Sequence, residues 1–196
     1  MNHLTILVLL RIFFLILLAF SLISCTSTKS NGVIYHNQFD FSQVKTYGFY
    51  PLGSDFTEVQ SLSYSLRNSI EIAIEKAMDK QAFSYAKLDA ADIVVTYHLL
   101  TGKSKDYSRY NKAVLFCQHC LKANTWHQSD SSIKLSKGSL ILDLIDPKKN
   151  RSVWRSAQPL SIKDKDNSRE VNQKIQQAVE IMLSQYPKTN LTSTKQ

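Results

Sequence analysis

Cys117 and Cys120 form the part of the sequence with the clearest chemical potential. They enclose Gln118 and His119, and His127 follows a little further along the chain. In an oxidising compartment, two neighbouring cysteines favour a local disulfide bond, which is the pairing we expect.

Two other uses of this cysteine pair stay open. A metal site can be imagined from Cys117, His119, Cys120 and His127, although no second pair of closely spaced ligands completes a structural zinc motif. A thioredoxin-like redox pair needs a cysteine at a helix N-terminus within a βαβ unit to lower the thiol pKa, and no such pattern precedes Cys117. The sequence therefore predicts no metal and no other cofactor.

Residues 101 to 112 are polar, and the basic side chains among them are interleaved with tyrosines. This composition suits contact with phosphate groups or sugar rings. The candidate residues for an anionic ligand are Lys103, Lys105, Tyr107, Arg109, Tyr110 and Lys112. The alternative is a solvated loop without a ligand.

The carboxylates and glycines of the sequence form no catalytic motif. Asp143 and Asp146 could act as paired carboxylates, but Asp146 is placed to begin a turn and Asp143 to pair with a base such as Arg155. Only five glycines occur, and the pair Gly48 and Gly53 has phosphate-loop spacing without the lysine that must follow. The sequence also lacks H-E-x-x-H and G-x-S-x-G motifs. We therefore expect a protein that is not an enzyme.

The N-terminal 24 residues have the plan of a bacterial lipoprotein signal peptide. Arg11 precedes an uncharged apolar run over residues 12 to 23, and Leu22-Ile23-Ser24-Cys25 resembles a lipobox. Cys25 would become the lipidated N-terminus, and two or three acyl chains would anchor it stably. The alternative is an uncleaved membrane anchor.

The residue after Cys25 is Thr26 rather than Asp, which by resemblance to sorted lipoproteins favours the periplasmic face of the outer membrane. Removal of the signal peptide takes away Arg11 and no acid, so the formal charge falls from +8 to +7. Outside the cytoplasm, the polyanions that a basic protein meets are lipid headgroups and envelope polymers. We expect membrane attachment through lipid and no nucleic acid. The basic surface could bind an anionic polymer or another envelope protein, and the alternative is a solvated charge excess without a partner.

The apolar spacing predicts the elements that must position these residues. Strands are expected at 44–50, 92–100, 139–146 and 151–157, the last two forming a hairpin across the turn at 146–150. Helices are expected at 58–80, with Thr57 and Gln60 as a capping pair, and at 168–186, with Asn167 and Glu170 as another. Trp154 is expected in the core, while Trp126 could be exposed for binding.

This order of elements excludes a doubly wound parallel sheet, because hairpins impose antiparallel neighbours. We predict an α+β fold, a mostly antiparallel sheet with two helices packed on one face. The expected organisation is a signal peptide (1–24), a lipidated N-terminus and flexible tether (25–38), a single domain (39–187) with an insertion at about 101–131, and a disordered tail (188–196).

Four segments in this order resemble a known family of bacterial lipoproteins, the domain of unknown function 4136. They are residues 39–51 (Phe-Asp-Phe-Ser-Gln-Val-Lys-Thr-Tyr-Gly-Phe-Tyr-Pro), 91–98, 138–146 and 153–155, and Tyr186-Pro187 closes the match. The resemblance implies an envelope lipoprotein with an α+β domain and carries no catalytic residues. The sequence departs from the family pattern at Ser156, where a glycine often follows the arginine, and in the cysteine-bearing insertion.

Overall fold

The computed structural model describes residues 32–50, 62–100, 102–117, 119–123, 125–128 and 135–187. The strands are β1 (Val33–His36), β2 (Thr46–Phe49), β3 (Ser84–Tyr85), β4 (Ile93–Leu99), β5 (Trp126–Gln128), β6 (Ser139–Asp146) and β7 (Arg151–Pro159). The helices are α3 (Tyr64–Lys80), α4 (Ser104–Ala113) and α5 (Ser168–Leu183), with short 3-10 turns η1 (Phe41–Gln43) and η2 (His119–Lys122).

The strands of the described chain form one sheet in the order β3-β2-β4-β6-β7-β1-β5. Strand β2 pairs in parallel with β3 and β4, and the other pairings are antiparallel. The α+β class is as predicted. The sheet, predicted to be mostly antiparallel, is mixed, with four antiparallel and two parallel pairings among the described strands. Strand β3 is parallel to β2 because the crossover through α3 returns the chain in the same direction, and β4 then pairs in parallel on the other side of β2.

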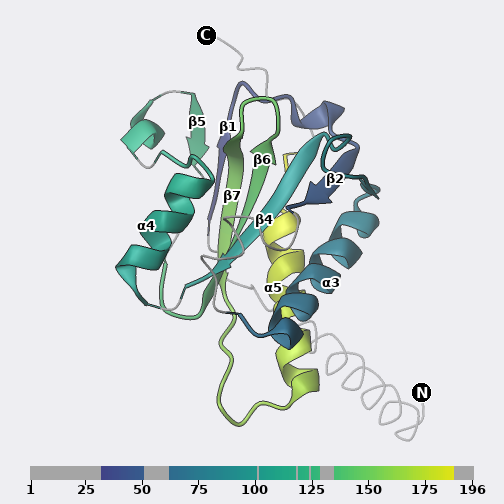
Figure 1. Ribbon diagram of the computed structural model, residues 1–196, viewed down its shortest axis with the longest axis vertical. Coiled ribbons are helices and arrows are strands. Elements are labelled where there is room, and N and C mark those ends of the chain that lie inside the picture. Colours follow the sequence, from purple (N-terminus) through teal and green to yellow (C-terminus); the bar gives the residue numbers. More distant parts are fainter. Residues whose placement is uncertain are drawn as a thin grey trace, which may run out of the picture.

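Helices cover both faces of the sheet, which corrects the prediction of two helices on one face. Helices α3 and α5 pack against each other on one face, and α4 lies on the other (Figure 1). Helix α4 falls within the insertion, where a polar loop was one of the expectations.

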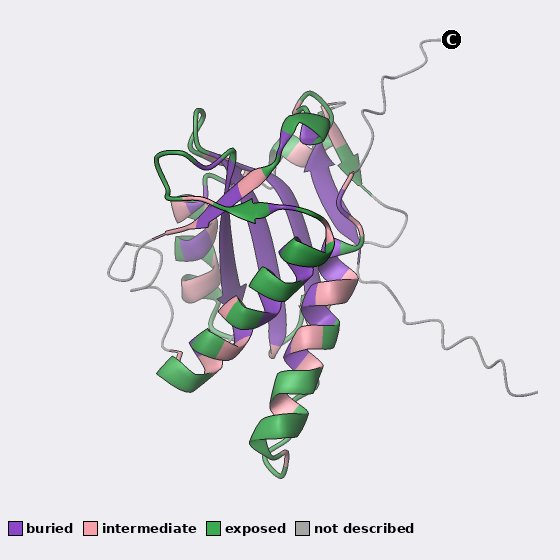
Figure 2. Ribbon diagram, turned by 90° about the vertical axis from the view of Figure 1, so that its right-hand side faces the viewer, coloured by how far each residue is buried: buried purple, intermediate pink, exposed green. Residues whose placement is uncertain are grey.

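The sheet supplies the core to both helical layers. The larger apolar cluster lies between the sheet and α3 and α5, and it includes Ile74, Leu142, Trp154 and Val179, each almost fully buried. A smaller cluster joins the other face to α4 through Val94, Ile141, Ile145 and their neighbours. Figure 2 shows the central strands buried and the outer sides of α3 and α5 exposed. Trp154 is in the core, as predicted.

Side-chain caps fix where the two long helices begin. The capping box of Asn167 and Glu170 is present, with each side chain accepting a hydrogen bond from the backbone N–H of the other. Helix α3 begins at Tyr64 and is capped by Ser63, later than the predicted start near residue 58. The predicted pair Thr57 and Gln60 lies outside the described residues.

The folded part begins earlier than predicted. Val33–His36 is a buried strand between β7 and β5, so this segment is not a flexible tether. Its backbone pairs on both sides, and Val33 and Tyr35 join the larger core cluster. The signal peptide, Cys25 and the tail from 188 lie outside the described residues. Among the helices described, none is both long enough and apolar enough to cross a membrane.

Candidate functional site

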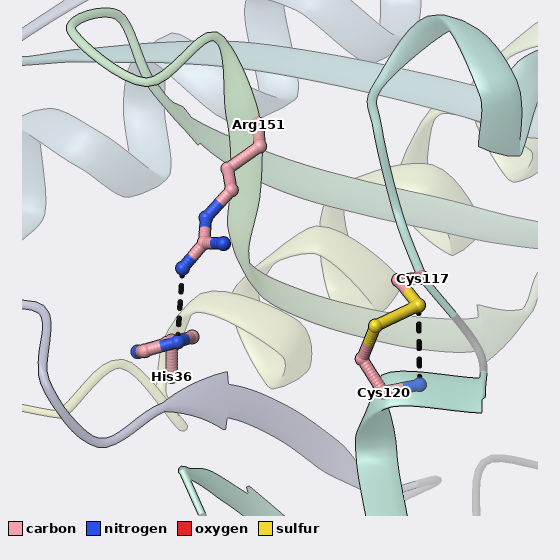
Figure 3. The surroundings of a disulfide bond; sticks show 4 residues. All are labelled: His36, Cys117, Cys120 and Arg151. Atoms are coloured by element: carbon pink, nitrogen blue, oxygen red, sulfur yellow. Dashed lines mark hydrogen bonds between the residues drawn. A yellow bond between two sulfur atoms is a disulfide. The ribbon is translucent and has the colours of Figure 1, made fainter. Parts of the chain in front are cut away.

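The cysteine pair lies just after α4, in the insertion. The Sγ atoms of Cys117 and Cys120 are 1.98 Å apart in a disulfide bond, the arrangement expected from the sequence. The backbone N–H of Cys120 also donates to the Sγ of Cys117 at 3.1 Å (Figure 3). In this state neither sulfur is a thiolate that could bind a metal or attack a substrate.

The histidines proposed as further metal ligands have different surroundings. His127 lies on β5, where its ring stacks on Tyr35 with the centroids 4.6 Å apart. The side chain of His119 is outside the described part of the structure. Within that part, no three histidine, cysteine, aspartate or glutamate side chains are grouped to hold a metal ion.

Helix α4 divides the candidate anion-binding residues between its two sides. Lys103, Lys105, Arg109 and Lys112 are exposed, whereas Tyr110 is fully buried and Tyr107 is partly buried. The two tyrosines face the sheet, so they do not join the lysines in one exposed ligand site. The six residues therefore do not form one anion site: the basic side chains lie on the outer side of α4 and the tyrosines on its inner side.

Beneath α4 the sheet carries a buried ion pair. The guanidinium of Arg155 donates to both carboxylate oxygens of Asp143, from Nε at 2.9 Å and from Nη2 at 2.9 Å. Both side chains are 1% exposed or less, and their residues lie opposite each other on β6 and β7. Asp143 therefore has the structural role that its position suggested and is not an exposed catalytic acid.

Two hydroxyl groups complete the environment of Asp143. Tyr110 donates to Oδ2 at 2.7 Å and Ser152 donates to Oδ1 at 2.6 Å. Burial, with Asp143 beside it, raises the pKa of Tyr110 well above its ordinary range, so this hydroxyl stays protonated and keeps donating. A β-bulge after Leu144 pairs Ile145 with Ser152 and brings Ser152 to this face.

Arg155 also holds the insertion in place. Its Nη1 donates to the Oδ1 of Asn111 on α4 at 2.8 Å, and its guanidinium carbon lies 3.6 Å from the ring centroid of Phe116. Phe116 directly precedes Cys117, so the disulfide loop begins next to the residue that covers Arg155. The ion pair, α4 and the disulfide loop form one connected unit.

His98 is buried on this face without a polar contact to any of the described residues. It is 1% exposed, and its ring stacks on Tyr110 with centroids 4.7 Å apart. Neither ring nitrogen has a hydrogen-bond partner among the described residues. Burial lowers the pKa of His98 to about 4, so the ring is neutral at pH 7.

A cleft of about 460 Å³ opens on the same face of the sheet, between the segment before β4 and the β6–β7 turn. Apolar side chains line part of it, from Leu88, Ala91, Val94 and Pro147. Polar groups come from Tyr50, Asp89, Lys148 and Asn150, and the hydroxyl of Tyr50 donates to the Oδ1 of Asn150 at 3.1 Å. This volume falls in the range of small-molecule sites, and the lining combines apolar contact with a few orienting polar groups.

Gly48 is needed for one wall of this cleft. A Cβ at this position would lie 3.0 Å from the carbonyl oxygen of Ala86 and 3.2 Å from the Cβ of Ala91. The absence of a side chain lets the segment before β4 approach β2 closely. This segment carries Leu88, Asp89 and Ala91 of the cleft.

Sequence reasoning did not identify the cleft, His98 or Ser152 as parts of this face. Tyr50 and Asn150 are far apart in the sequence, and only the pairing of β2, β4 and β6 brings them together. A signal for His98 was available, because it lies in the apolar run that forms β4. Trp126, which could have been exposed, is partly buried and packs edge-on against His36 and Phe116.

Comparison with known proteins gives one family and two solved structures. A family model described as Domain of unknown function (DUF4136) matches residues 33–188. The search of curated proteins gives no match. The chain is 15% identical to a DUF4136 family protein from Bacteroides thetaiotaomicron, over 82% of this chain and 98% of that one, with a TM-score of 0.46.

The second structure is a PDZ domain protein from Parabacteroides distasonis. The identity is 12% and the TM-score 0.44, with 82% of this chain covered. The match spans 36% of that protein, so this chain corresponds to about a third of it.

Proposed function

Because this chain belongs to the DUF4136 family, whose model covers residues 33–188, we propose that it is a cell-envelope lipoprotein with a binding or assembly role and no catalysis of its own. The protein is attached through Cys25 to the outer membrane and faces the periplasm. The observation that carries this proposal is the lipobox ending at Cys25, a short distance before the first buried strand at Val33. This spacing gives a lipid-attached cysteine and a folded domain with little chain between them.

The cleft lined by Tyr50 and Asn150 is where such a protein would bind a small ligand. It combines a suitable volume with apolar and polar lining, whereas Asp143 and Arg155 satisfy each other in the interior. A Tyr50→Ala and Asn150→Ala pair would remove the polar contact across the cleft while leaving the buried ion pair. Loss of ligand binding in this variant, with unchanged binding in a Ser69→Ala variant on the far face, would support the cleft as the ligand-binding site.

Labelling of the full chain tests the anchor. In bacteria fed an alkyne fatty acid, the wild-type protein should carry the label and stay with membranes, and Cys25→Ser should lose both. A Cys117→Ser/Cys120→Ser variant is the matched control and should keep the label. An unlabelled wild-type protein would contradict the proposal.

Separation of inner and outer membranes tests the location. The wild-type protein should be found in the outer-membrane fraction, and Thr26→Asp should move it to the inner membrane, by resemblance to sorted lipoproteins. The alternative function, metal binding or thiol redox chemistry at Cys117 and Cys120, predicts instead a metal ion in the native mass of the purified protein. A native mass that corresponds to the disulfide-bonded protein without a metal ion would favour the envelope binding role.

A further inference from the structure

Exposed lysines lie together at one end of the sheet, the end at which the first strand, β1, begins. The backbones of Leu100, Gly138 and Leu160 lie side by side there, because Gly138 N–H donates to Leu100 O at 2.8 Å and Leu160 N–H donates to Gly138 O at 3.1 Å. Lys103, Lys137 and Lys163 each lie within three residues of this row, and all three are exposed. We name these three residues the basic end.

The first strand starts at the same end. Val33 pairs with Ser156, and the Ser156 hydroxyl donates to the carbonyl of Gly32 at 3.3 Å. Since β7 ends at Pro159 beside the start of β6, Gly32 lies near the basic end. In Figure 1 the loop between β7 and α5 lies at this lower end, and α4 begins on the same side of the molecule.

The length of chain before β1 limits which end can face the membrane. Seven residues lie between Cys25 and Val33, and fully extended they span at most about 25 Å. The nine-residue strand β7 is about 30 Å long. The opposite end of the sheet could meet the membrane only if the linking chain ran back along the whole sheet, so a lipid on Cys25 keeps the basic end next to the bilayer.

The groups around the basic end suit a headgroup layer. Lys105, Lys165 and Arg169 add positive charge there, and Ile162 and Leu135 are exposed apolar side chains. The acids nearby are Asp106, Asp164, Asp166 and Glu170. Asp166 is paired with Lys174 at 2.6 Å, and Glu170 accepts the capping hydrogen bond of Asn167. Positive charge therefore exceeds negative charge at this end.

We propose that the basic end is a membrane-contact surface that binds the phosphate groups of anionic lipids through Lys103, Lys137 and Lys163. The orientation rests on the proposed lipid anchor at Cys25, whereas the lipid binding itself does not need the anchor. Each lysine near an anionic surface contributes about 1 kcal/mol, which is about a fivefold change in partitioning. The contact would hold the cleft lined by Tyr50 and Asn150 in a fixed position above the membrane.

Vesicle sedimentation tests the surface without the anchor. The chain from residue 26 to 196 keeps every described residue and carries no lipid. It should bind vesicles of phosphatidylcholine with phosphatidylglycerol, and not phosphatidylcholine alone. The variant Lys103→Gln/Lys137→Gln/Lys163→Gln should bind at least about tenfold more weakly.

The matched control removes the same charge elsewhere. Lys45→Gln/Lys87→Gln/Lys149→Gln changes exposed lysines near the starts of β2 and β4 and in the β6–β7 turn, and it should bind as the wild-type chain does. Equal weakening in both variants would mean a response to net charge and would overturn the proposal. The proposal would also be overturned if the chain did not bind vesicles, or if it bound a soluble polyanion instead of vesicles. Failure of fatty-acid labelling at Cys25 would refute the anchor and leave this result standing.

Discussion

Loss of the Asp143 carboxylate should strongly destabilise the domain. In Asp143→Asn the guanidinium of Arg155 keeps its burial and loses its counter-charge, and removal of one partner of a buried pair costs about 3–5 kcal/mol. Urea unfolding followed by circular dichroism measures this loss. The control is Glu180→Gln in the exposed pair with Lys80, which should cost less than about 1 kcal/mol. Equal losses in the two variants would show that the buried pair contributes no more to stability than the exposed pair.

Replacement of both partners, as Asp143→Leu/Arg155→Met, should recover much of the stability, because no buried charge is then left alone.

His98 should make the stability of the domain fall as the pH is lowered from 6.5 to 4. In the unfolded chain the histidine pKa is about 6.5, whereas in the folded protein burial lowers it to about 4. Within this window the unfolded state binds a proton that the folded state does not, so stability decreases, and below pH 4 the effect levels off. The full effect is about 3 kcal/mol. In His98→Phe, which keeps the ring contact with Tyr110, unfolding free energies measured across the window should depend much less on pH. His36, whose pKa is also lowered by burial, leaves a smaller slope of the same sign. An unchanged slope in His98→Phe would assign the effect to other groups.

At the scale of elements, the disulfide should fix the insertion locally and contribute little to overall stability. A closed loop of this size restricts the unfolded chain by less than about 2 kcal/mol. Cys117→Ser/Cys120→Ser should therefore unfold in urea with nearly the wild-type midpoint. Reduction of the wild-type protein should reproduce the same small change, and reductant should not affect the variant. Global unfolding of the reduced protein would contradict this assignment.

Elements with strong local signals were predictable from the sequence, and those that depend on distant partners were not. The β6–β7 hairpin follows from alternation and turn residues, and α5 from its apolar stripe and the capping box of Asn167. The parallel pairing of β2 with β4 is non-local, and β1 is too short to stand out from its polar surroundings. Helix α4 escaped prediction because its inward residues, Tyr107, Tyr110 and Asn111, bind a buried arginine instead of forming an apolar stripe. Of the candidate site, the disulfide and the partner of Asp143 were predictable, but the cleft requires the assembled sheet.

At the scale of the molecule, the two faces of the sheet differ in how firmly their helices are held. Among the described residues, the cluster that joins the sheet to α3 and α5 has 26 buried members, and the one that joins it to α4 has eight. The α4 layer depends instead on polar contacts to Asp143 and Arg155. We therefore expect it to open separately from the rest of the domain, at a lower free energy.

Native-state hydrogen exchange should show this difference between the layers. Two amides at the ends of the helices can be compared directly. The Val114 N–H donates to the carbonyl of Tyr110 on α4, and the Ser184 N–H donates to the carbonyl of Glu180 on α5. The Val114 amide should exchange faster, through an opening that needs less urea than global unfolding. Tyr110→Phe removes one hydrogen bond to Asp143 and should speed exchange in α4 by about fivefold or more, with little change in α5. Ser69→Ala, which removes the hydrogen bond to Asn172 between α3 and α5, is the matched control and should leave α4 unchanged. If Tyr110→Phe speeds exchange equally in both helices, the domain opens as one unit and α4 has no separate motion.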